Sequence, residues 1–247
     1  MMHDRVRQRL LYRIHRRYQT RTHGIKLGPV EFNFTRIADP DRVLDQVAAE
    51  EDRRELACGR RATDDELNLP YWAELWDSAT AIGQFIVNLH HPLATSPANA
   101  QPLGTVLDMG CGMGFAGTVA ATLGARVLFA DLETPALLFA TLNSLPWRHR
   151  ARARRLDWRR DQLGQKFDLI LGADILYDRS QWPYLEPFWR NHLAPAGHIL
   201  LGEPGRQTGD LFIPWITEKR WRLEQFEQPV PTRPRPVRIL RLSPPQP

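Results

Sequence analysis

Three glycines at alternate positions follow an acidic residue that ends an apolar run. The acidic residue is Asp108, and the glycines are Gly110, Gly112 and Gly114. The apolar run suits a buried strand, and the glycines permit a tight turn that brings backbone close to a ligand. At the entrance to this turn, the Asp108 carboxylate can bind a cationic or hydroxyl-rich molecule. We therefore expect a small-molecule site at this loop.

The same loop also matches the dinucleotide-binding pattern G-x-G-x-x-G. Residues 112–117 provide the match, and Asp131 follows at about the expected distance. However, a pyrophosphate binds backbone N–H groups at a helix N-terminus, and the neighbouring carboxylate of Asp108 would repel it. S-adenosylmethionine carries an ammonium and a sulfonium and no phosphate. The loop therefore favours this methyl donor over NAD.

Acidic residues also lie at the ends of the other predicted strands. Strands are predicted at residues 104–108, 126–130, 150–156, 167–172 and 198–202, and the acidic residues at or near their ends are Asp108, Asp131, Asp157, Asp174 and Glu203. Ligands of open α/β sheets bind beyond the carboxyl ends of the strands, so these side chains together predict one site. Individually, Asp131 or Asp174 can also be interpreted as the cap of a following helix.

Strands and helices alternate from about residue 104 onward, which is typical of a mostly parallel sheet. Residues 222–227 and 237–242 are predicted to close it as an antiparallel hairpin. We predict a small extension at residues 1–65 and a main domain at 66–247. In the extension we expect a basic helix to about residue 24, a strand at 30–35 and a helix at 41–50 capped by Asp39. A further helix is expected after Pro70, with Trp72, Leu75, Trp76, Ala79, Ile82 and Phe85 on one face.

Composition limits the class of protein. The 247 residues can form one large core with a small appendage, and no apolar run reaches membrane-spanning length. The two cysteines, Cys58 and Cys111, are far apart and form no disulfide framework or metal-binding pattern. No secretory signal begins the sequence, so we predict a cytoplasmic protein without a structural metal.

The net charge of +5 comes from arginines in two clusters. The first lies in the N-terminal helix, which we interpret as a solvated helix packed on the domain rather than a surface for nucleic acid or an acidic partner. The second, residues 148–160, contains an alternating Ala-Arg pattern. Charges on an edge strand oppose unwanted strand pairing, so we expect this strand at the rim of the sheet, with RNA binding as the less favoured alternative.

Four motifs together resemble the class I, seven-stranded S-adenosylmethionine-dependent methyltransferases, and within them the methyltransferase-16 group, largely protein-lysine methyltransferases. These motifs are the glycine loop, Leu156-Asp157-Trp158, Asp174-Ile175-Leu176-Tyr177 and the aromatic segment Pro70–Trp76. The resemblance covers roughly residues 65–245. It implies a Rossmann-like, doubly wound α/β sheet with strand order 3-2-1-4-5-7-6 and the last strand antiparallel.

The resemblance also implies roles on the cofactor side. Asp108 and the three loop glycines would hold the methionine end of S-adenosylmethionine, with Asp174 close to the cofactor as well. Asp131 would accept hydrogen bonds from the ribose hydroxyls through two free oxygens, and Asp157 would accept from the adenine amino group. Two tryptophans complete this side: Trp158 stacks on the adenine, and Trp76 either closes the pocket or belongs to the core.

On the substrate side, the resemblance implies that Asp174 and Tyr177 act in catalysis. Methyl transfer needs a neutral amine, whereas a carboxylate alone raises the pKa of a bound lysine. Desolvation by aromatic side chains would lower that pKa, and further acidic groups would accept hydrogen bonds. The aromatic residues expected here are Tyr71, Trp72, Tyr177 and Trp182, and the acidic ones are Glu74 and Glu203.

These expectations converge on methyl transfer to an amine, with a protein lysine as the favoured acceptor. A small-molecule amine is the alternative substrate, and a silent module that binds RNA or protein is the alternative function. Nucleobase methyltransferases carry two prolines between the Asp or Asn and the Tyr of the motif at residues 174–177, and this sequence has none there. That difference argues against a nucleobase acceptor.

Overall fold

A computed structural model describes residues 2–59, 69–90 and 103–245. Its centre is a seven-stranded sheet in the order β5-β4-β3-β6-β7-β9-β8. The strands are β3 (Thr105–Met109), β4 (Arg126–Asp131), β5 (Ala151–Arg155), β6 (Phe167–Ala173), β7 (Leu193–Glu203), β8 (Arg222–Gln228) and β9 (Val237–Ser243). β9 runs antiparallel to both of its neighbours, whereas the other pairs are parallel. The predicted strand order and antiparallel last strand are confirmed.

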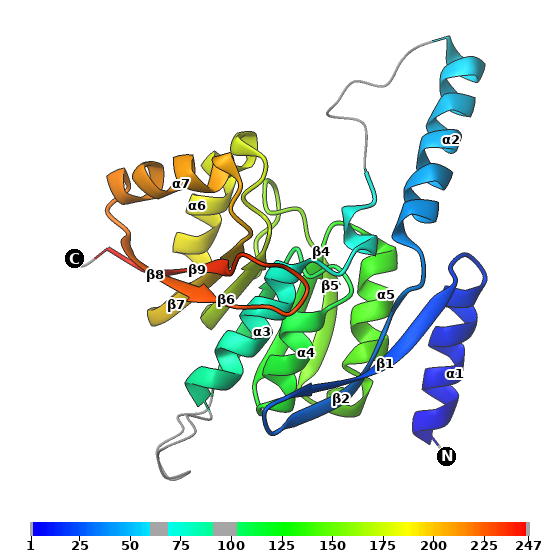
Figure 1. Cartoon of the computed structure of the whole chain (residues 1–247), viewed down its shortest axis with the longest axis horizontal. Coiled ribbons are helices and arrows are strands. Elements are labelled where there is room, and N and C mark those ends of the chain that lie inside the picture. The colour runs from blue at the N-terminus through cyan, green and yellow to red at the C-terminus, as the bar shows by residue number, and fades with distance from the viewer. Residues whose placement is uncertain (1, 60–68, 91–102, 246–247) are drawn as a thin grey trace.

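Helices cover both faces of the sheet (Figure 1). They are α3 (Asp77–His90), α4 (Phe115–Thr122), α5 (Thr134–Asn143), α6 (Trp182–His192) and α7 (Gln207–Glu218). One buried cluster joins the α3–α5 side to the sheet, and a second joins the α6–α7 side to it. Burial of the central strands on both faces explains their nearly continuous apolar sequences. None of the described helices is long and apolar enough to cross a membrane.

The aromatic segment after Pro70 does not form the start of one long helix, as we had expected. It makes a short 3₁₀ helix at Tyr71–Ala73, and α3 begins only at Asp77. Trp72 therefore does not share a helical face with Ile82. Instead, its indole packs edge-on to Tyr18, with ring centroids 5.3 Å apart.

The N-terminal part begins with α1 (Met2–His15), β1 (Thr20–Leu27), β2 (Val30–Ile37) and α2 (Pro40–Cys58). The predicted basic helix to residue 24 is wrong beyond His15, because Thr20–Leu27 pairs antiparallel with β2 through a tight turn at Gly28. Asp39 caps α2 as predicted, accepting the N–H of Arg42 at 3.2 Å. The helix continues eight residues beyond the expected end at residue 50 and extends away from the body (Figure 1).

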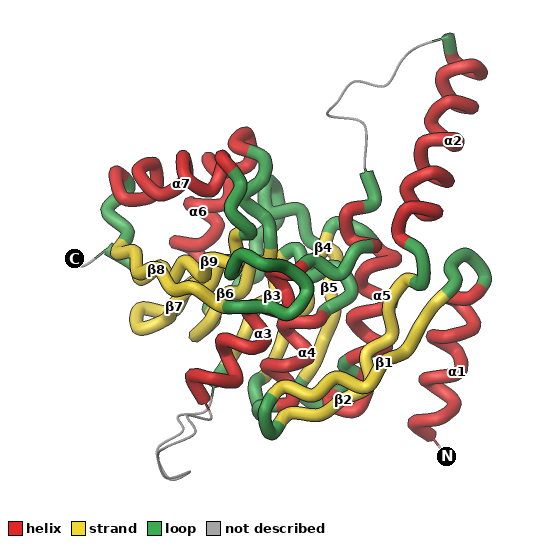
Figure 2. The backbone as a smooth tube through the Cα atoms, in the orientation of Figure 1, coloured by secondary structure: helices red, strands yellow, loops and turns green. Residues whose placement is uncertain are grey.

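The β1–β2 hairpin lies over α4 and α5 (Figure 2). Asn143 of α5 fixes it there, since its side chain accepts the N–H of Thr35 at 2.8 Å and donates to the Thr35 carbonyl at 2.9 Å. The same amide donates to the carbonyl of Met113 in the glycine loop at 3.0 Å. The extension thus shares a core with the main domain and contacts the loop that forms the site.

The two edges of the seven-stranded sheet are β5 and β8, and β5 lies at an edge as its alternating arginines predicted. Arg152 and Arg154 are exposed, and Arg154 donates to the carbonyl of Gln162. Their charge on an open edge opposes pairing with other strands.

Candidate active site

A cavity of about 410 Å³ opens beyond the carboxyl ends of β3, β4 and β6. This volume lies in the range of small-molecule sites. Most of the predicted site residues line it, namely Tyr71, Trp72, Glu74, Trp76, Gly110, Gly112, Asp131, Asp157, Trp158, Asp174 and Tyr177. Asp108, Gly114 and Glu203 are not part of its wall.

The glycine loop forms the floor of the cavity with its backbone. Gly110 and Gly112 have φ values of 62° and 51°, a left-handed conformation that glycine adopts without strain. Gly114 has a different task, because a Cβ there would lie 2.8 Å from the Cβ of Ala140. It therefore allows α4 to start against α5 instead of touching the cavity.

Asp108 lies behind this loop. Its side chain is buried, and its Oδ2 accepts the N–H of Gly117 at 2.9 Å. Burial raises the pKa of this carboxyl to about 7, although the Gly117 N–H opposes the rise. In this arrangement Asp108 anchors the first turn of α4, so its direct contact with a ligand stays a prediction.

Asp131 reaches the cavity wall from the end of β4. The expectation that both of its oxygens are free is wrong: Oδ2 accepts the N–H of Gly112 at 2.8 Å and Oδ1 that of Glu133 at 2.9 Å. Each carboxylate oxygen retains a second lone pair for a ligand hydroxyl. Burial raises the pKa of this carboxyl to about 6, against the effect of these N–H donors.

Asp157 lies near Asp131 on the wall, but its carboxylate is already paired. Arg159 donates to Oδ1 and Oδ2 at 3.0 and 3.1 Å and holds the pKa of this carboxyl below its usual range. The adjacent Trp158 also faces the cavity, and its Nε1 donates to Gln181 at 3.2 Å. The backbone N–H of Arg159 also donates to Oδ1 at 3.0 Å, so the predicted contact of Asp157 with an adenine amino group requires the remaining lone pair of Oδ2.

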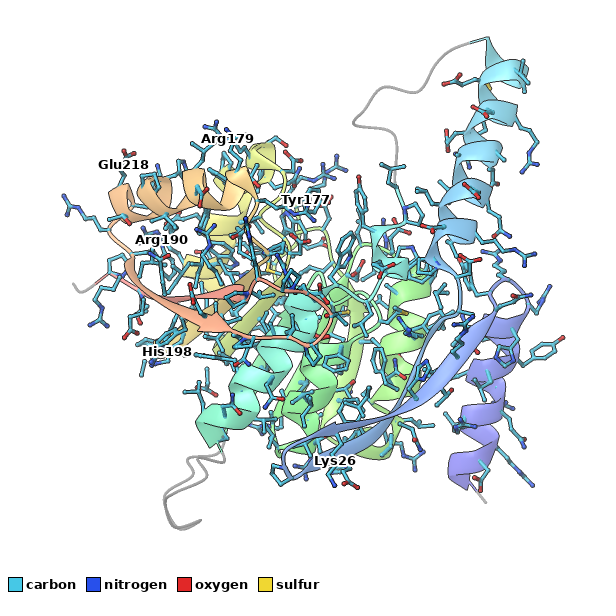
Figure 3. All side chains as sticks on the ribbon, viewed as in Figure 1. Lys26, Tyr177, Arg179, Arg190, His198 and Glu218 are labelled. Carbon is cyan, nitrogen blue, oxygen red and sulfur yellow. The ribbon has the colours of Figure 1, made fainter. Side chains whose placement is uncertain are left out.

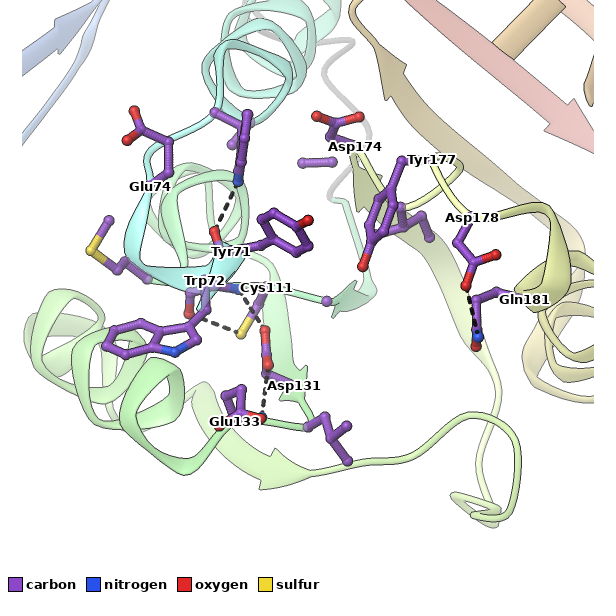
Figure 4. A pocket seen from close by; sticks show the side chains of 18 of the residues that line it. Tyr71, Trp72, Glu74, Cys111, Asp131, Glu133, Asp174, Tyr177, Asp178 and Gln181 are labelled. Atoms are coloured by element: carbon purple, nitrogen blue, oxygen red, sulfur yellow. Dashed lines mark hydrogen bonds between the residues drawn. The ribbon is translucent and has the colours of Figure 1, made fainter. Parts of the chain in front are cut away.

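Two tyrosines stand at the cavity. The rings of Tyr71 and Tyr177 meet edge to face at 5.6 Å, and about half of each residue is exposed (Figure 4). Trp76 lies beside them and donates from Nε1 to the Tyr71 carbonyl at 2.9 Å. These three side chains form one aromatic group on the wall, and Trp158 is a further aromatic residue there.

Two other predicted aromatic residues serve mainly the core. Most of Trp72 is buried, and its ring lies 6.0 Å from that of Phe139, pointing away from the tyrosine pair (Figure 4). Trp182 was expected to desolvate the substrate, but it is not on the cavity wall. It packs on Phe212 and donates to the Leu176 carbonyl inside the α6–α7 core.

Asp174 follows β6 with a left-handed backbone, φ 53°, and its N–H donates to the Gly202 carbonyl at 2.9 Å. Its carboxylate receives two hydrogen bonds from Arg206, Nε to Oδ1 at 2.9 Å and Nη2 to Oδ2 at 2.6 Å. Burial raises the pKa of the Asp174 carboxyl despite this guanidinium. The guanidinium also lies 5.7 Å from the ring centroid of Trp76. Asp174, Arg206 and Trp76 thus form one cluster on the wall.

The family of this chain follows from its match to a known family model. The model of the lysine methyltransferase family, methyltransferase-16, matches residues 61–217, more than half of the chain. The chain belongs to this lysine methyltransferase family.

Curated relatives agree with this assignment. The chain is 32% identical over 136 residues to the protein N-lysine methyltransferase METTL21A of Xenopus tropicalis, covering 52% of this chain and 58% of that protein. It is 35% identical over 107 residues to the EEF1A lysine methyltransferase 3 of Mus musculus, covering 41% and 45% respectively. The chain spans about half the length of the curated relatives that it matches.

Solved structures share the fold. The N-methyltransferase NodS from Bradyrhizobium japonicum superposes with a TM-score of 0.55 at 17% identity, covering 82% of this chain and 98% of NodS. The glycopeptide N-methyltransferase MtfA complexed with S-adenosylmethionine gives a TM-score of 0.53 at 15% identity, covering 68% and 94%. At these identities the likeness concerns the fold alone.

Glu203 does not line the cavity on the substrate side, where we expected it. Its side chain is buried, with Oε1 accepting the N–H of Gly205 at 2.9 Å and Oε2 accepting Nε of Arg238 at 2.9 Å. Oε1 also accepts the backbone N–H of Arg206. Glu203 is therefore occupied in holding the turn that presents Arg206.

The main residue that the sequence analysis missed is Arg206. It lies three residues beyond the end of β7, where strand-end geometry already placed Glu203. Extending that rule to basic residues would have found it. Glu74 does line the cavity as predicted, and burial raises the pKa of its carboxyl. Among the described residues, no group of three or more acidic, His or Cys side chains is placed to hold a metal ion.

Proposed function

We propose that this chain transfers a methyl group from S-adenosylmethionine to a protein lysine. The observation that carries the proposal is the cavity at the carboxyl ends of β3, β4 and β6, where a glycine loop, buried carboxylates and aromatic rings meet in a chain of the lysine methyltransferase family. We also propose a cytoplasmic location, since Cys58 and Cys111 are both free.

The residues of the cavity fit S-adenosylmethionine. Gly110 and Gly112 line the cavity without side chains, which leaves room for a ligand. A Cβ on Gly110 would lie only 3.0 Å from the side chain of Ile175, which lines the same cavity. The Asp131 carboxylate suits a pair of ribose hydroxyls, and the ring of Trp158 suits a flat base. Both lie on the cavity wall, as do the apolar side chains of Leu132 and Leu156.

When bound, S-adenosylmethionine supplies an electrophilic methyl carbon: the lone pair of the amine forms the N–C bond while the C–S bond electrons pass to sulfur. The chain itself must bring a neutral amine close to that carbon and exclude water. In this proposal, Tyr71 and Tyr177 cover the aliphatic part of an entering side chain and Asp174 orients its nitrogen, which is supported by the position of all three on the cavity wall.

A protein lysine is the acceptor that the wall favours. Tyr71 and Tyr177 are each about half exposed, so both are accessible from outside the cavity. A long side chain that projects from the surface of another protein can therefore contact them. The curated relatives named above methylate lysine in proteins according to their names.

The proposal is tested by incubating the purified protein with S-adenosylmethionine carrying a labelled methyl group and a lysate of its host. We expect a labelled protein band that releases methyl-lysine on acid hydrolysis, and no such band with Asp174→Ala. Label confined to small molecules would replace the lysine acceptor by a small-molecule amine. An absence of all labelling, with S-adenosylmethionine bound, would indicate a catalytically silent module.

A further inference from the structure

The Arg206–Asp174 pair occupies the part of the cavity where the proposed function places the acceptor amine. Asp174 is almost fully buried, with 6% of its side chain exposed, whereas 42% of the Arg206 side chain is accessible. The inference below concerns this pair and rests on the proposed function.

A buried carboxylate beside an acceptor lysine creates a conflict. It attracts and orients the ammonium form, but the same negative charge stabilises the proton on nitrogen. A free lysine already has a pKa of about 10.4, so it arrives protonated near neutral pH. Methyl transfer uses the neutral amine. An unpaired Asp174 would therefore favour binding and oppose the reaction.

We propose that Arg206 is a positioning residue that neutralises Asp174, so that this carboxylate orients the acceptor amine without holding its proton. The proton step balances simply. An N–H bond of the ammonium breaks, its electron pair remains on nitrogen, and the proton passes to water. The guanidinium keeps its own proton throughout, because arginine stays charged in proteins.

The geometry of the pair fits this role. The two hydrogen bonds, at 2.9 and 2.6 Å, use one lone pair on each oxygen of Asp174. A second lone pair on each oxygen remains for the N–H of an acceptor amine. A fixed positive charge close to the acceptor also disfavours a second positive charge on its nitrogen.

Both partners are held from behind. The Asp174 N–H is bound to the Gly202 carbonyl on β7, and the Arg206 N–H is bound to Glu203. The guanidinium also lies over the ring of Trp76, which supports it. The pair is thus part of the wall and not two mobile surface side chains.

Other charged and titratable groups act on Asp174 as well. Glu203 on β7 raises the pKa of the Asp174 carboxyl, and Arg233 from the β8–β9 link lowers it. Three residues after Asp174, burial raises the pKa of the Tyr177 hydroxyl, and the charge of Asp174 contributes to that rise. Farther along the cavity wall are Tyr71, Glu74, Asp131, Glu133, Asp157, Arg159 and Asp178. Arg206 is distinguished among the described cations on this wall by its two direct bonds to Asp174.

The first test measures cation binding without methyl transfer. n-Butylammonium, which mimics the end of a lysine side chain, is titrated into the full chain at about pH 8 and followed by NMR. Removing the guanidinium frees Asp174, so Arg206→Gln should bind the cation about fivefold or more tightly than the wild type. Equal or weaker binding by Arg206→Gln would overturn the proposal.

Arg190→Gln is the matched control. Arg190 also pairs with a buried carboxylate, Glu186, and lies over a tryptophan, but it is not on the cavity wall. Its variant should bind n-butylammonium like the wild type. The double variant Arg206→Gln/Asp174→Asn should lose the gained affinity, which shows that the gain passes through Asp174.

The second test follows kinetics with the protein substrate found by labelling. In Arg206→Gln we expect kcat to fall and its rise with pH to shift upward by about one unit, while KM stays equal or falls. Arg206→Lys should restore part of kcat. A purely structural role would lower kcat equally at every pH, and that result would contradict the proposal.

The two tests separate this inference from the proposed function. If no protein lysine is methylated but Arg206→Gln gains affinity for n-butylammonium through Asp174, the lysine substrate is wrong and the masking of Asp174 holds. If lysine is methylated and the cation affinity does not change, the masking is wrong and the proposed function holds.

Discussion

Two arginine–carboxylate–tryptophan clusters in this molecule have nearly the same components and different surroundings. In one, Arg206 pairs with Asp174 and lies over Trp76 on the cavity wall. In the other, Arg190 pairs with Glu186 and lies over Trp221. Arg190 lies on the α6–α7 side, away from Tyr177 (Figure 3). Both guanidinium side chains are 42% exposed, and both carboxylates are nearly buried.

The partners of the carboxylate distinguish the two clusters. Glu186 Oε1 accepts both the Arg190 guanidinium and the Trp221 Nε1, the latter at 2.8 Å, so the indole and the ion pair lock together. Trp76 instead donates to the Tyr71 carbonyl, which leaves Asp174 with Arg206 as its side-chain partner. The Glu186 carboxylate joins two side chains away from the cavity and stabilises the fold, whereas the Asp174 carboxylate binds one side chain and lies on the wall of a cavity where it can bind a ligand.

The largest difference should appear in activity. We expect Asp174→Ala to lower methyl transfer by about 100-fold or more, because the acceptor amine loses its orienting group. Binding of S-adenosylmethionine, measured by calorimetry, should change by no more than a few-fold. An equal loss of transfer and of donor binding would move Asp174 into the donor site.

The stability of the fold should depend more on the Glu186 cluster than on the Asp174 cluster. Glu186→Ala leaves a guanidinium and a buried indole N–H without their acceptor, so we expect a loss of about 2–4 kcal/mol in the free energy of unfolding. The folded variant should keep the transfer rate of the wild type. Urea unfolding followed by fluorescence measures the loss. If Glu186→Ala lowers kcat without lowering stability, the two clusters do not differ in the way described.

The stability of the protein should depend on pH through two buried carboxyls next to the glycine loop, Asp108 and Asp131. The pKa of the Asp108 carboxyl is about 7 in the folded protein and 3.8 as its ordinary value, and that of Asp131 is about 6. Because both are raised by folding, their stabilising contribution is complete below about pH 4 and is lost as the pH rises through 6 to 7. Asp108→Asn should therefore gain about 1–3 kcal/mol relative to the wild type between pH 4 and 8.

Arg190→Gln provides the comparison for this pH effect. It removes a charge outside the cavity, so its stability should follow the pH dependence of the wild type. Urea midpoints at several pH values measure both variants. A constant difference between Asp108→Asn and the wild type at all pH values would show that Asp108 is already ionised in the folded protein.

The smallest effect is expected at the tryptophans. Trp76→Leu should lower kcat for the protein substrate about three- to fivefold, because the guanidinium loses its support and neutralises Asp174 less well, with less than about 1 kcal/mol lost in stability. Trp221→Leu should cost more stability, about 2 kcal/mol, because this side chain is buried and bound to Glu186. Its kcat should not change, and an equal loss of kcat in both variants would contradict the difference between the two clusters.

Much of the sheet could be predicted because its signals are local. Apolar runs of strand length ended at Asp108 and Asp131, and helices separated them, so parallel order and a shared ligand edge followed. The hairpin strand Thr20–Leu27 was missed because six of its eight residues, all except Ile25 and Leu27, are polar or glycine and indicate no buried face, and its partner β2 supplies most of the packing.

The candidate site was predictable in its positions and less so in its pairings. The ends of strands located Asp131, Asp157 and Asp174 at one cavity. Their partners depend on side-chain contacts that spacing does not reveal, above all the bond from Arg206 to a carboxylate 32 positions earlier. For the same reason Glu203, whose position was equally suggestive, proved to be engaged with Arg238.

The most direct measurement is a calorimetric titration of S-adenosylmethionine into the wild type, Asp131→Ala and Glu186→Ala. We expect one site in the wild type and in folded Glu186→Ala, and affinity weaker by about tenfold or more in Asp131→Ala, since the ribose loses a charged acceptor. NAD should not compete. Failure of the wild type to bind, preference for NAD, or an equal loss in both variants would contradict a methyl-donor site at this cavity.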